Sequence, residues 1–239
     1  APLPKSFMLS AYGYALGAGC SRLALAPFIR HRVLGAEHVP AVGSAILAPN
    51  HISHFDPPLI GVSTSRQVDW MAMRELFTNP ILGGALHWIG SFPVGRGSLD
   101  RAAVRIAIER LKSGRLVGLF PEGGLRTGPE SVLEGAPLRP GVAALSQIGQ
   151  APVIPCAIIG TDALYDPWRW MPLRRTRAWT VFGPPLNPPP PHGDKATARK
   201  EFESKLGQVI RELYTRTVRE EGIPRDCLPQ TPQHRKGKN

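Results

Sequence analysis

Short apolar runs alternate along this chain with stretches in which apolar residues recur every three to four positions. The runs that have the length of a buried strand are residues 45–48, 69–73, 116–120, 153–159 and 179–182. The stretches that have the period of an amphipathic helix are residues 98–113, 140–148 and 195–221. Strands separated by helices predict an α/β fold, in which a twisted, mainly parallel sheet is flanked by helices.

Three regions of the chain differ in pattern. Residues 36–222 carry the strand and helix signals, and a chain of 239 residues fits one large domain better than two. We therefore expect a single domain over residues 36–222. Residues 223–239 are mostly polar and basic, so we expect a disordered tail there.

Residues 1–35 contain an apolar segment that is too short to cross a bilayer. Residues 6–21 carry no charge, but Arg22 interrupts the segment, and a spanning helix needs about 20 apolar residues in a row. A helical segment that lies in the membrane interface fits this pattern better. A helix buried in the protein core is the alternative. We expect residues 1–35 to be a membrane-associated helical segment.

The net charge of the chain indicates an acidic binding partner but does not identify it. The formal net charge is +11, which favours an acidic partner such as nucleic acid, an anionic membrane or an acidic carrier protein. No motif with base-stacking aromatic residues is visible, so we expect no nucleic-acid partner. The three cysteines, Cys20, Cys156 and Cys227, form no CxxC pair, which disfavours a disulfide framework or a zinc site.

The strongest chemical signal is a histidine followed five positions later by an aspartate. Residues 49–57 read PNHISHFDP, directly after an apolar strand. Asp56 and Pro57 have the order of a helix N-cap and a first helical residue. His51 could turn back towards Asp56 and act as a general base that Asp56 orients. No serine or cysteine nucleophile lies in an elbow motif beside them, so direct attack of an acceptor hydroxyl on a thioester is the simplest reaction. Alternatively, Asp56 only caps the helix and His51 only bonds a loop carbonyl.

Four ordered sequence blocks then point to a family. The segment NHISHFD at residues 50–56 resembles the His-x4-Asp motif of the glycerolipid acyltransferases, a group that includes the bacterial 1-acylglycerol-3-phosphate acyltransferases. GSFPVGR at 90–96, FPEGGLR at 120–126 and VIPCAIIG at 153–160 resemble the second, third and fourth blocks of that family. The chain departs from the family at Gly95, often Asp, at the displaced arginine of the third block, and at Arg139, where lysine is common.

The resemblance assigns roles to individual residues. It implies that His51 is the general base and that Asp56 orients it, while Arg96 and Arg126 grip the acceptor phosphate. Glu122 would hold an arginine in place or bond a glycerol hydroxyl. Gly123 would let backbone N–H groups approach the substrate, or would merely form the turn after a strand.

The resemblance also implies substrates and a location. The donor would be acyl-CoA or acyl carrier protein, and the acceptor would be 1-acylglycerol-3-phosphate. Glycerol 3-phosphate or another lysolipid remains open as acceptor. We expect no metal and no organic cofactor, and we expect the cytoplasmic face of the inner or plasma membrane as the location. Two functions of other classes also stay open: a non-catalytic lipid-binding module and a metal-dependent hydrolase that uses His51, His54 and Asp56.

Overall fold

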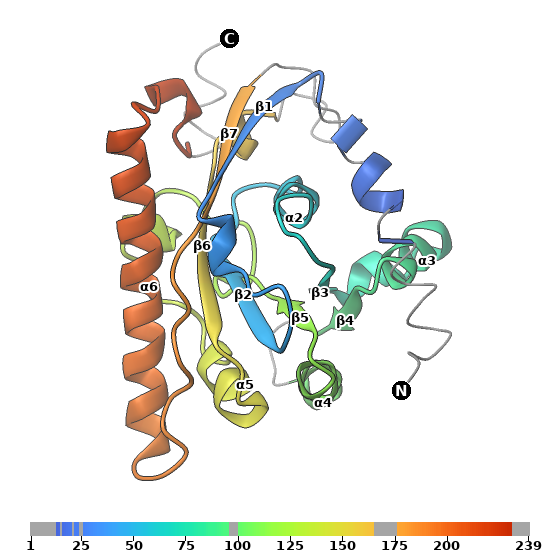
Figure 1. The fold of residues 1–239 in the computed structure, drawn as a ribbon, viewed down its shortest axis with the longest axis vertical. Helices are drawn as coiled ribbons and strands as arrows, with labels where there is room; N and C mark the ends of the chain where they lie inside the picture. Colours follow the sequence, from blue (N-terminus) through green and yellow to red (C-terminus); the bar gives the residue numbers. More distant parts are fainter. Residues whose placement is uncertain are drawn as a thin grey trace.

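A computed structural model describes residues 13–14, 16–20, 22–23, 26–95, 100–164 and 176–230. These residues form one seven-stranded sheet with the strand order β1-β7-β6-β2-β5-β3-β4 (Figure 1). The strands are β1 (Ile29–Leu34), β2 (Ala45–Pro49), β3 (Val68–Met73), β4 (Phe92–Val94), β5 (Leu116–Gly118), β6 (Val153–Ile159) and β7 (Thr176–Phe182). β6, β2, β5, β3 and β4 are parallel, and β7 runs antiparallel to β6 and parallel to β1. The expected α/β fold with a mainly parallel sheet is confirmed.

Helices cover both faces of this sheet, which explains why its central strands are apolar on both sides. The helices are α2 (Asp56–Gly61), α3 (Pro80–Trp88), α4 (Arg101–Lys112), α5 (Val142–Gly149) and α6 (Lys195–Glu220). On β2, Leu47 packs in the core under α2, and its neighbour Ile46 packs in the core under α4, α5 and α6. This alternation follows from the two-residue period of a strand. Both side chains are completely buried.

Short 3-10 turns connect several of these elements. They are Ala36–His38, Arg74–Phe77, Gly128–Glu130, Val132–Glu134, Thr161–Leu164 and Arg225–Cys227.

Most of the elements expected from the sequence are present, with small differences at their ends. β6 has the predicted bounds. α4 begins after Asp100, which caps the helix: its carboxylate accepts hydrogen bonds from the backbone N–H groups of Ala102 and Ala103. β5 ends at Gly118, two residues earlier than expected. α3 and β4 were not predicted; the proline and glycines of α3 hide its helical period, and β4 has only three residues.

Both ends of the expected domain need correction. Ile29–Leu34, which we expected in the helical N-terminal segment, is strand β1 and pairs with β7 along its whole length. At the other end, Ile223 and Cys227 are buried in the core beside β6 and β7, so the segment from 223 to 230 is not a disordered tail. Both segments contain isolated apolar residues within polar sequence. These residues are ordered here because the sheet and α6 give them a surface to pack on.

Before β1, the structure describes helical residues at 13–14, 16–20 and 22–23. They lie against α3, since a side chain at Gly13 would overlap the Trp88 ring and one at Gly17 would touch Ile89. Over the described residues, we find no helix with the length and apolarity that crossing a bilayer requires.

Candidate active site

Three neighbouring strands end at the same edge of the sheet and carry the candidate site. His51 follows β2, Glu122 follows β5, and Thr161 follows β6. β2 lies between β6 and β5 and is parallel to both. The carboxyl edge of a parallel sheet is where α/β proteins place their ligands, because loops from adjacent strands converge there.

His51 and Asp56 form the hydrogen-bonded pair that the sequence predicted. Nδ1 of His51 lies 2.8 Å from Oδ2 of Asp56. The Asp56 side chain is completely buried, and the His51 side chain retains 14% of its exposure. Among the described residues, Nε2 of His51 takes part in no hydrogen bond, so this nitrogen is available to a substrate. The arrangement allows one ring nitrogen to be oriented while the other accepts a proton.

The role of Asp56 in the loop differs from the expected helix cap. Asp56 is the first residue of α2, and its side chain turns back rather than forward. Oδ2 accepts hydrogen bonds from the backbone N–H groups of Ile52 and Ser53, each at 2.8 Å, and Oδ1 accepts one from the Thr161 hydroxyl at 2.5 Å. Together with His51, four donors surround a carboxylate without water contact, which compensates its burial.

Glu122 fixes the backbone of His51 instead of holding an arginine. Its Oε2 accepts the backbone N–H of His51 at 2.6 Å, and its Oε1 accepts the Ser131 hydroxyl at 3.0 Å and the Val132 N–H at 2.8 Å. Burial raises the pKa of Glu122, against the hydrogen bonds that favour its charged form. Among the described residues, Glu122 forms no ion pair with an arginine, and its oxygens bind neutral donors instead. The alternative, a bond to a glycerol hydroxyl, stays a prediction.

The segment after β5 holds His51 from several sides. The backbone N–H of Arg126 donates to the His51 carbonyl at 2.8 Å. The Phe120 ring stacks on the His51 imidazole with a centroid distance of 3.8 Å, and the Trp70 ring stacks on Phe120 at 5.0 Å. Gly118 leaves room for this stack, since a side chain there would overlap the Trp70 ring. The imidazole plane is thus set by packing as well as by hydrogen bonds.

Of the two arginines expected to bind phosphate, the structure describes Arg126. Arg126 pairs through Nη1 with Oε2 of Glu130 at 2.8 Å, and its side chain keeps 29% of its exposure. Arg96 lies outside the described residues. Gly123 adopts φ of 69° and donates its N–H to the Phe120 carbonyl, which is the turn that the sequence offered as the simpler alternative. A side chain at Gly123 would overlap Arg139, a further cation near this turn.

His54, the other histidine of the loop, is exposed, and burial of part of its ring together with the nearby His51 lowers its pKa. In the described part of the chain, no three side chains of His, Cys, Asp or Glu are grouped so that they could share a metal ion.

Two site residues escaped the sequence analysis. Thr161 contacts Asp56 and Phe120 contacts His51, yet neither belongs to a residue type that signals catalysis by itself. Their position was the available signal, because each lies two residues after the end of a buried strand that runs parallel to β2. Asn50 also binds across strands, through its side chain to both backbone groups of Ile158 on β6.

Several known proteins are similar to this chain in sequence or in fold. Residues 30–159 match the Acyltransferase family. A 1-acyl-sn-glycerol-3-phosphate acyltransferase of Bacillus subtilis (strain 168) is 35% identical over 133 residues, which cover 55% of this chain and 64% of that protein. A protein of the same name from Streptococcus pneumoniae (strain ATCC BAA-255 / R6) is 28% identical over 144 residues, which cover 59% of this chain and 50% of that protein. The matches thus span less than two thirds of either relative.

The crystal structure of the 1-acyl-sn-glycerophosphate (LPA) acyltransferase PlsC from Thermotoga maritima has the same fold, with a TM-score of 0.67 and 21% sequence identity. The superposition covers 92% of this chain and 82% of that one. The family match includes His51, Asp56 and Glu122 and takes in more than half of the chain. This chain belongs to the Acyltransferase family.

Proposed function

We propose that this protein transfers a fatty acyl group from acyl-CoA or acyl carrier protein to the free hydroxyl of 1-acylglycerol-3-phosphate, which yields phosphatidic acid. The observation that carries the proposal is the His51–Asp56 pair, whose outer ring nitrogen has no partner among the described residues. The names of the Bacillus and Streptococcus relatives support this acceptor.

The proposed reaction uses His51 twice. Nε2 of His51 takes the proton of the acceptor hydroxyl while the hydroxyl oxygen attacks the carbonyl carbon of the thioester. Collapse of the tetrahedral intermediate breaks the carbon–sulfur bond, and the proton passes from the imidazolium to the departing sulfur. The Asp56 carboxylate stabilises the imidazolium between these two transfers. These steps require no metal and no organic cofactor.

Arg126 and Arg96 are the proposed phosphate ligands. The backbone of Arg126 is bonded to His51, so its side chain starts beside the general base. Its present partner, Glu130, is 74% exposed, and an ion pair so open to water contributes only about 0–1 kcal/mol. A phosphate could therefore replace Glu130 at little cost. In the sequence, Arg96 comes two residues after Val94, the last residue of β4.

We further propose that the protein works on a membrane, at the cytoplasmic face of the inner or plasma membrane. Apolar side chains are exposed on α3 and on the N-terminal helical residues: Leu16, Leu23, Ile81, Leu82 and Trp88. Ile81 is 84% exposed and Leu23 is 81% exposed. Such a group of exposed apolar side chains is typical of a membrane or protein contact, and an interfacial location suits a lipid acceptor.

The test is acyl transfer from radiolabelled acyl-CoA and acyl carrier protein to a panel of acceptors in detergent and in vesicles. The panel contains 1-acylglycerol-3-phosphate, glycerol 3-phosphate and lysolipids without a free phosphate. We expect the first to be the best acceptor. In His51→Ala we expect the rate to fall by about 100-fold or more, which is the usual contribution of a general base.

His54→Ala is the matched control, since it removes a histidine from the same loop, and it should keep most of the activity. A better rate with another acceptor would correct the substrate. If the wild type transfers to none of the acceptors, the enzymatic proposal fails and the lipid-binding alternative replaces it. If His51→Ala is as active as the wild type, the proposed base is wrong.

A further inference from the structure

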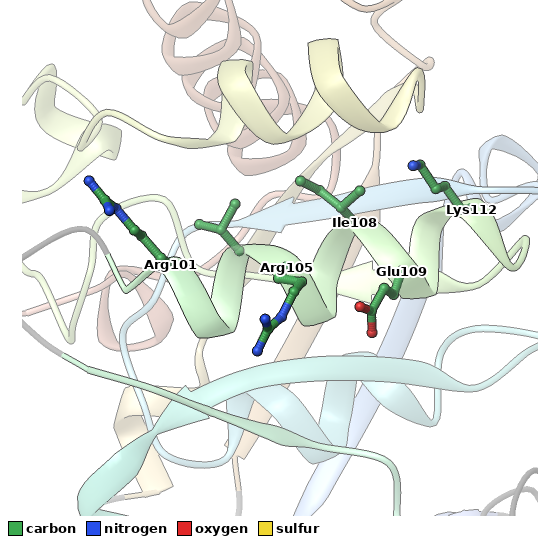
Figure 2. A pocket seen from close by; sticks show the side chains of 6 residues that line it. Arg101, Arg105, Ile108, Glu109 and Lys112 are labelled. Atoms are coloured by element: carbon green, nitrogen blue, oxygen red, sulfur yellow. The ribbon is translucent and has the colours of Figure 1, made fainter.

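The outer face of α4 carries a shallow hollow outside the candidate active site. Its volume is about 320 Å³, and its lining is Arg101, Val104, Arg105, Ile108, Glu109 and Lys112. Figure 2 shows that these side chains come from this one helix, with Arg101 near its start, Lys112 near its end and Ile108 between them. The spacing of three and four residues places them along one stripe of the helix.

Packing separates this stripe from the inner face of α4. Ala103, Ala107 and Leu111 are buried against the core. Arg110 is also turned inward, where its guanidinium binds the buried carboxylate of Asp69 at 2.9 Å and lies over the Phe92 ring. α4 is therefore held from the inside. Val104 and Ile108 of the outer stripe still pack partly against the core, whereas Arg101, Arg105 and Lys112 are exposed.

The side chains that line the hollow are mostly cationic, with two apolar side chains between them. Arg101, Arg105 and Lys112 are exposed, and none of them forms an ion pair with a described residue. Glu109 is the one acidic side chain in the lining, and Val104 and Ile108 are half-buried between the charges. An elongated hollow with this composition is complementary to a convex, acidic surface that also carries apolar side chains, such as a helix of an acidic protein.

One end of the hollow lies at the edge of the sheet where the candidate site is. Asp100 caps α4 and accepts a hydrogen bond from the backbone N–H of Gly95, directly after β4. β4 and β2 are separated by β3 and β5 in the sheet. The lateral distance between β4 and β2 is therefore three strand spacings, or about 14 Å. A thioester on a flexible arm could cross such a distance from a protein seated on α4.

We propose that the outer stripe of α4, defined as Arg101, Val104, Arg105, Ile108 and Lys112, is the docking surface for the acidic acyl carrier protein that delivers the donor. This inference rests on the proposed function and adds a partner to it. An anionic membrane would also attract the three cations. The hollow shape favours the carrier, since a bilayer is flat on this scale, and none of the exposed large apolar side chains of the described residues lies on α4.

The test compares two donors in one variant. In the double variant Arg101→Glu with Arg105→Glu, we expect the KM for acyl carrier protein to rise roughly tenfold and the KM for acyl-CoA to stay unchanged, because reversed rim charges weaken encounter with an acidic protein. The control is Lys205→Glu with Arg216→Glu, which makes the same change in net charge at exposed positions of α6. The control should leave both KM values at the wild-type level.

Binding provides a readout that does not depend on turnover. Fluorescence anisotropy with labelled acyl carrier protein should give a weaker Kd for the α4 double variant, and this difference should shrink as salt is raised. Binding to vesicles of anionic phospholipid is measured in parallel. We expect the α4 double variant and the α6 control to bind the vesicles equally well.

Each result decides one of the two proposals. If carrier binding is unchanged in the α4 variant, or if both donors are affected alike, the docking proposal is wrong. If only vesicle binding weakens, the stripe contacts lipid instead of the carrier. A wild type that binds the carrier through α4 but transfers no acyl group would retain the docking surface and overturn the proposed function.

Discussion

At the scale of single residues, the site is organised around one buried carboxylate. Asp56 receives four donors, and the imidazole of His51 is one of them. Three of the four come from the loop itself, while Thr161 comes from the end of β6, 105 positions later in the chain. The Thr161 hydroxyl therefore ties the orientation of Asp56, and through it that of His51, to the neighbouring strand.

Replacement of Thr161 tests this positioning role. Thr161→Val keeps the shape of the side chain and removes a donor to a buried charged group, a hydrogen bond that contributes about 1.5–3 kcal/mol. We expect kcat to fall by about tenfold or more with KM nearly unchanged, because Thr161 is completely buried and its hydroxyl binds Asp56. Steady-state kinetics with 1-acylglycerol-3-phosphate measures both constants.

Thr161→Ser is the conservative control, since it retains the hydroxyl, and it should recover most of kcat. Unfolding by urea is followed in parallel. A Thr161→Ser variant as slow as Thr161→Val would contradict the positioning role and point to simple packing of the methyl group.

At the scale of elements, β1 and β7 form a part of the sheet that runs opposite to the strands of the site. β1 pairs with β7 over six residues, and β7 pairs antiparallel with β6. His31 on β1 lies half-buried between Thr180 of β7, at 2.9 Å, and Ser63 beyond α2, at 3.5 Å. The histidine thus joins the β1–β7 pair to the segment that follows α2, and its charge state should affect stability.

Burial lowers the pKa of His31 to about 4 from its ordinary 6.5. Between these values the unfolded chain binds a proton that the folded chain does not, so stability is full above pH 6.5 and falls as the pH drops towards 4. The largest effect is about 3 kcal/mol, at 1.36 kcal/mol for each pKa unit. We expect His31→Gln to remove this part of the pH dependence, measured by urea unfolding at pH 4.5, 5.5 and 7.

Glutamine can still bond the Thr180 hydroxyl, so it serves as a neutral replacement for the imidazole. Parallel curves of unfolding free energy against pH for wild type and His31→Gln would show that His31 is not the group responsible.

At the scale of the whole molecule, apolar and cationic surfaces lie over different helices. Leu16, Leu23, Ile81, Leu82 and Trp88 are exposed on α3 and the N-terminal helical residues, whereas the cationic hollow follows α4. α3 and α4 occupy separate positions beside the sheet (Figure 1). The separation would let the protein face a lipid surface and a donor protein at the same time.

The membrane contact is tested by Ile81→Ser with Leu82→Ser on α3. Ile81 is 84% exposed and Leu82 is 44% exposed, so the changes should cost little folding stability. A buried leucine or isoleucine side chain contributes about 1.5–3 kcal/mol on transfer from water. We expect binding to phospholipid vesicles, measured by co-sedimentation, to weaken by at least tenfold.

Ile148→Ser on α5 removes an isoleucine that is 50% exposed, away from α3, and should leave vesicle binding intact. Equal loss in both variants would mean that membrane contact does not involve α3 specifically.

The sequence by itself determined the alternation of strands and helices, the motif blocks and the pairing of His51 with Asp56. These features are local: Asp56 lies only five positions after His51, and periodicity is read within one element. The sequence also indicated Glu122 as a site residue, although it did not indicate its donors, which are His51, Ser131 and Val132.

The tertiary structure alone decided which distant groups meet. Thr161 reaches Asp56, Glu122 binds the His51 backbone, and Phe120 stacks on the imidazole, because β6, β2 and β5 lie side by side and end at one edge. Ile29–Leu34 became a strand for a similar reason, since β7 offers it backbone partners that local sequence does not reveal. Contacts between residues about 70 to 150 positions apart depend on strand order, and the pattern of apolar residues along a chain does not specify that order.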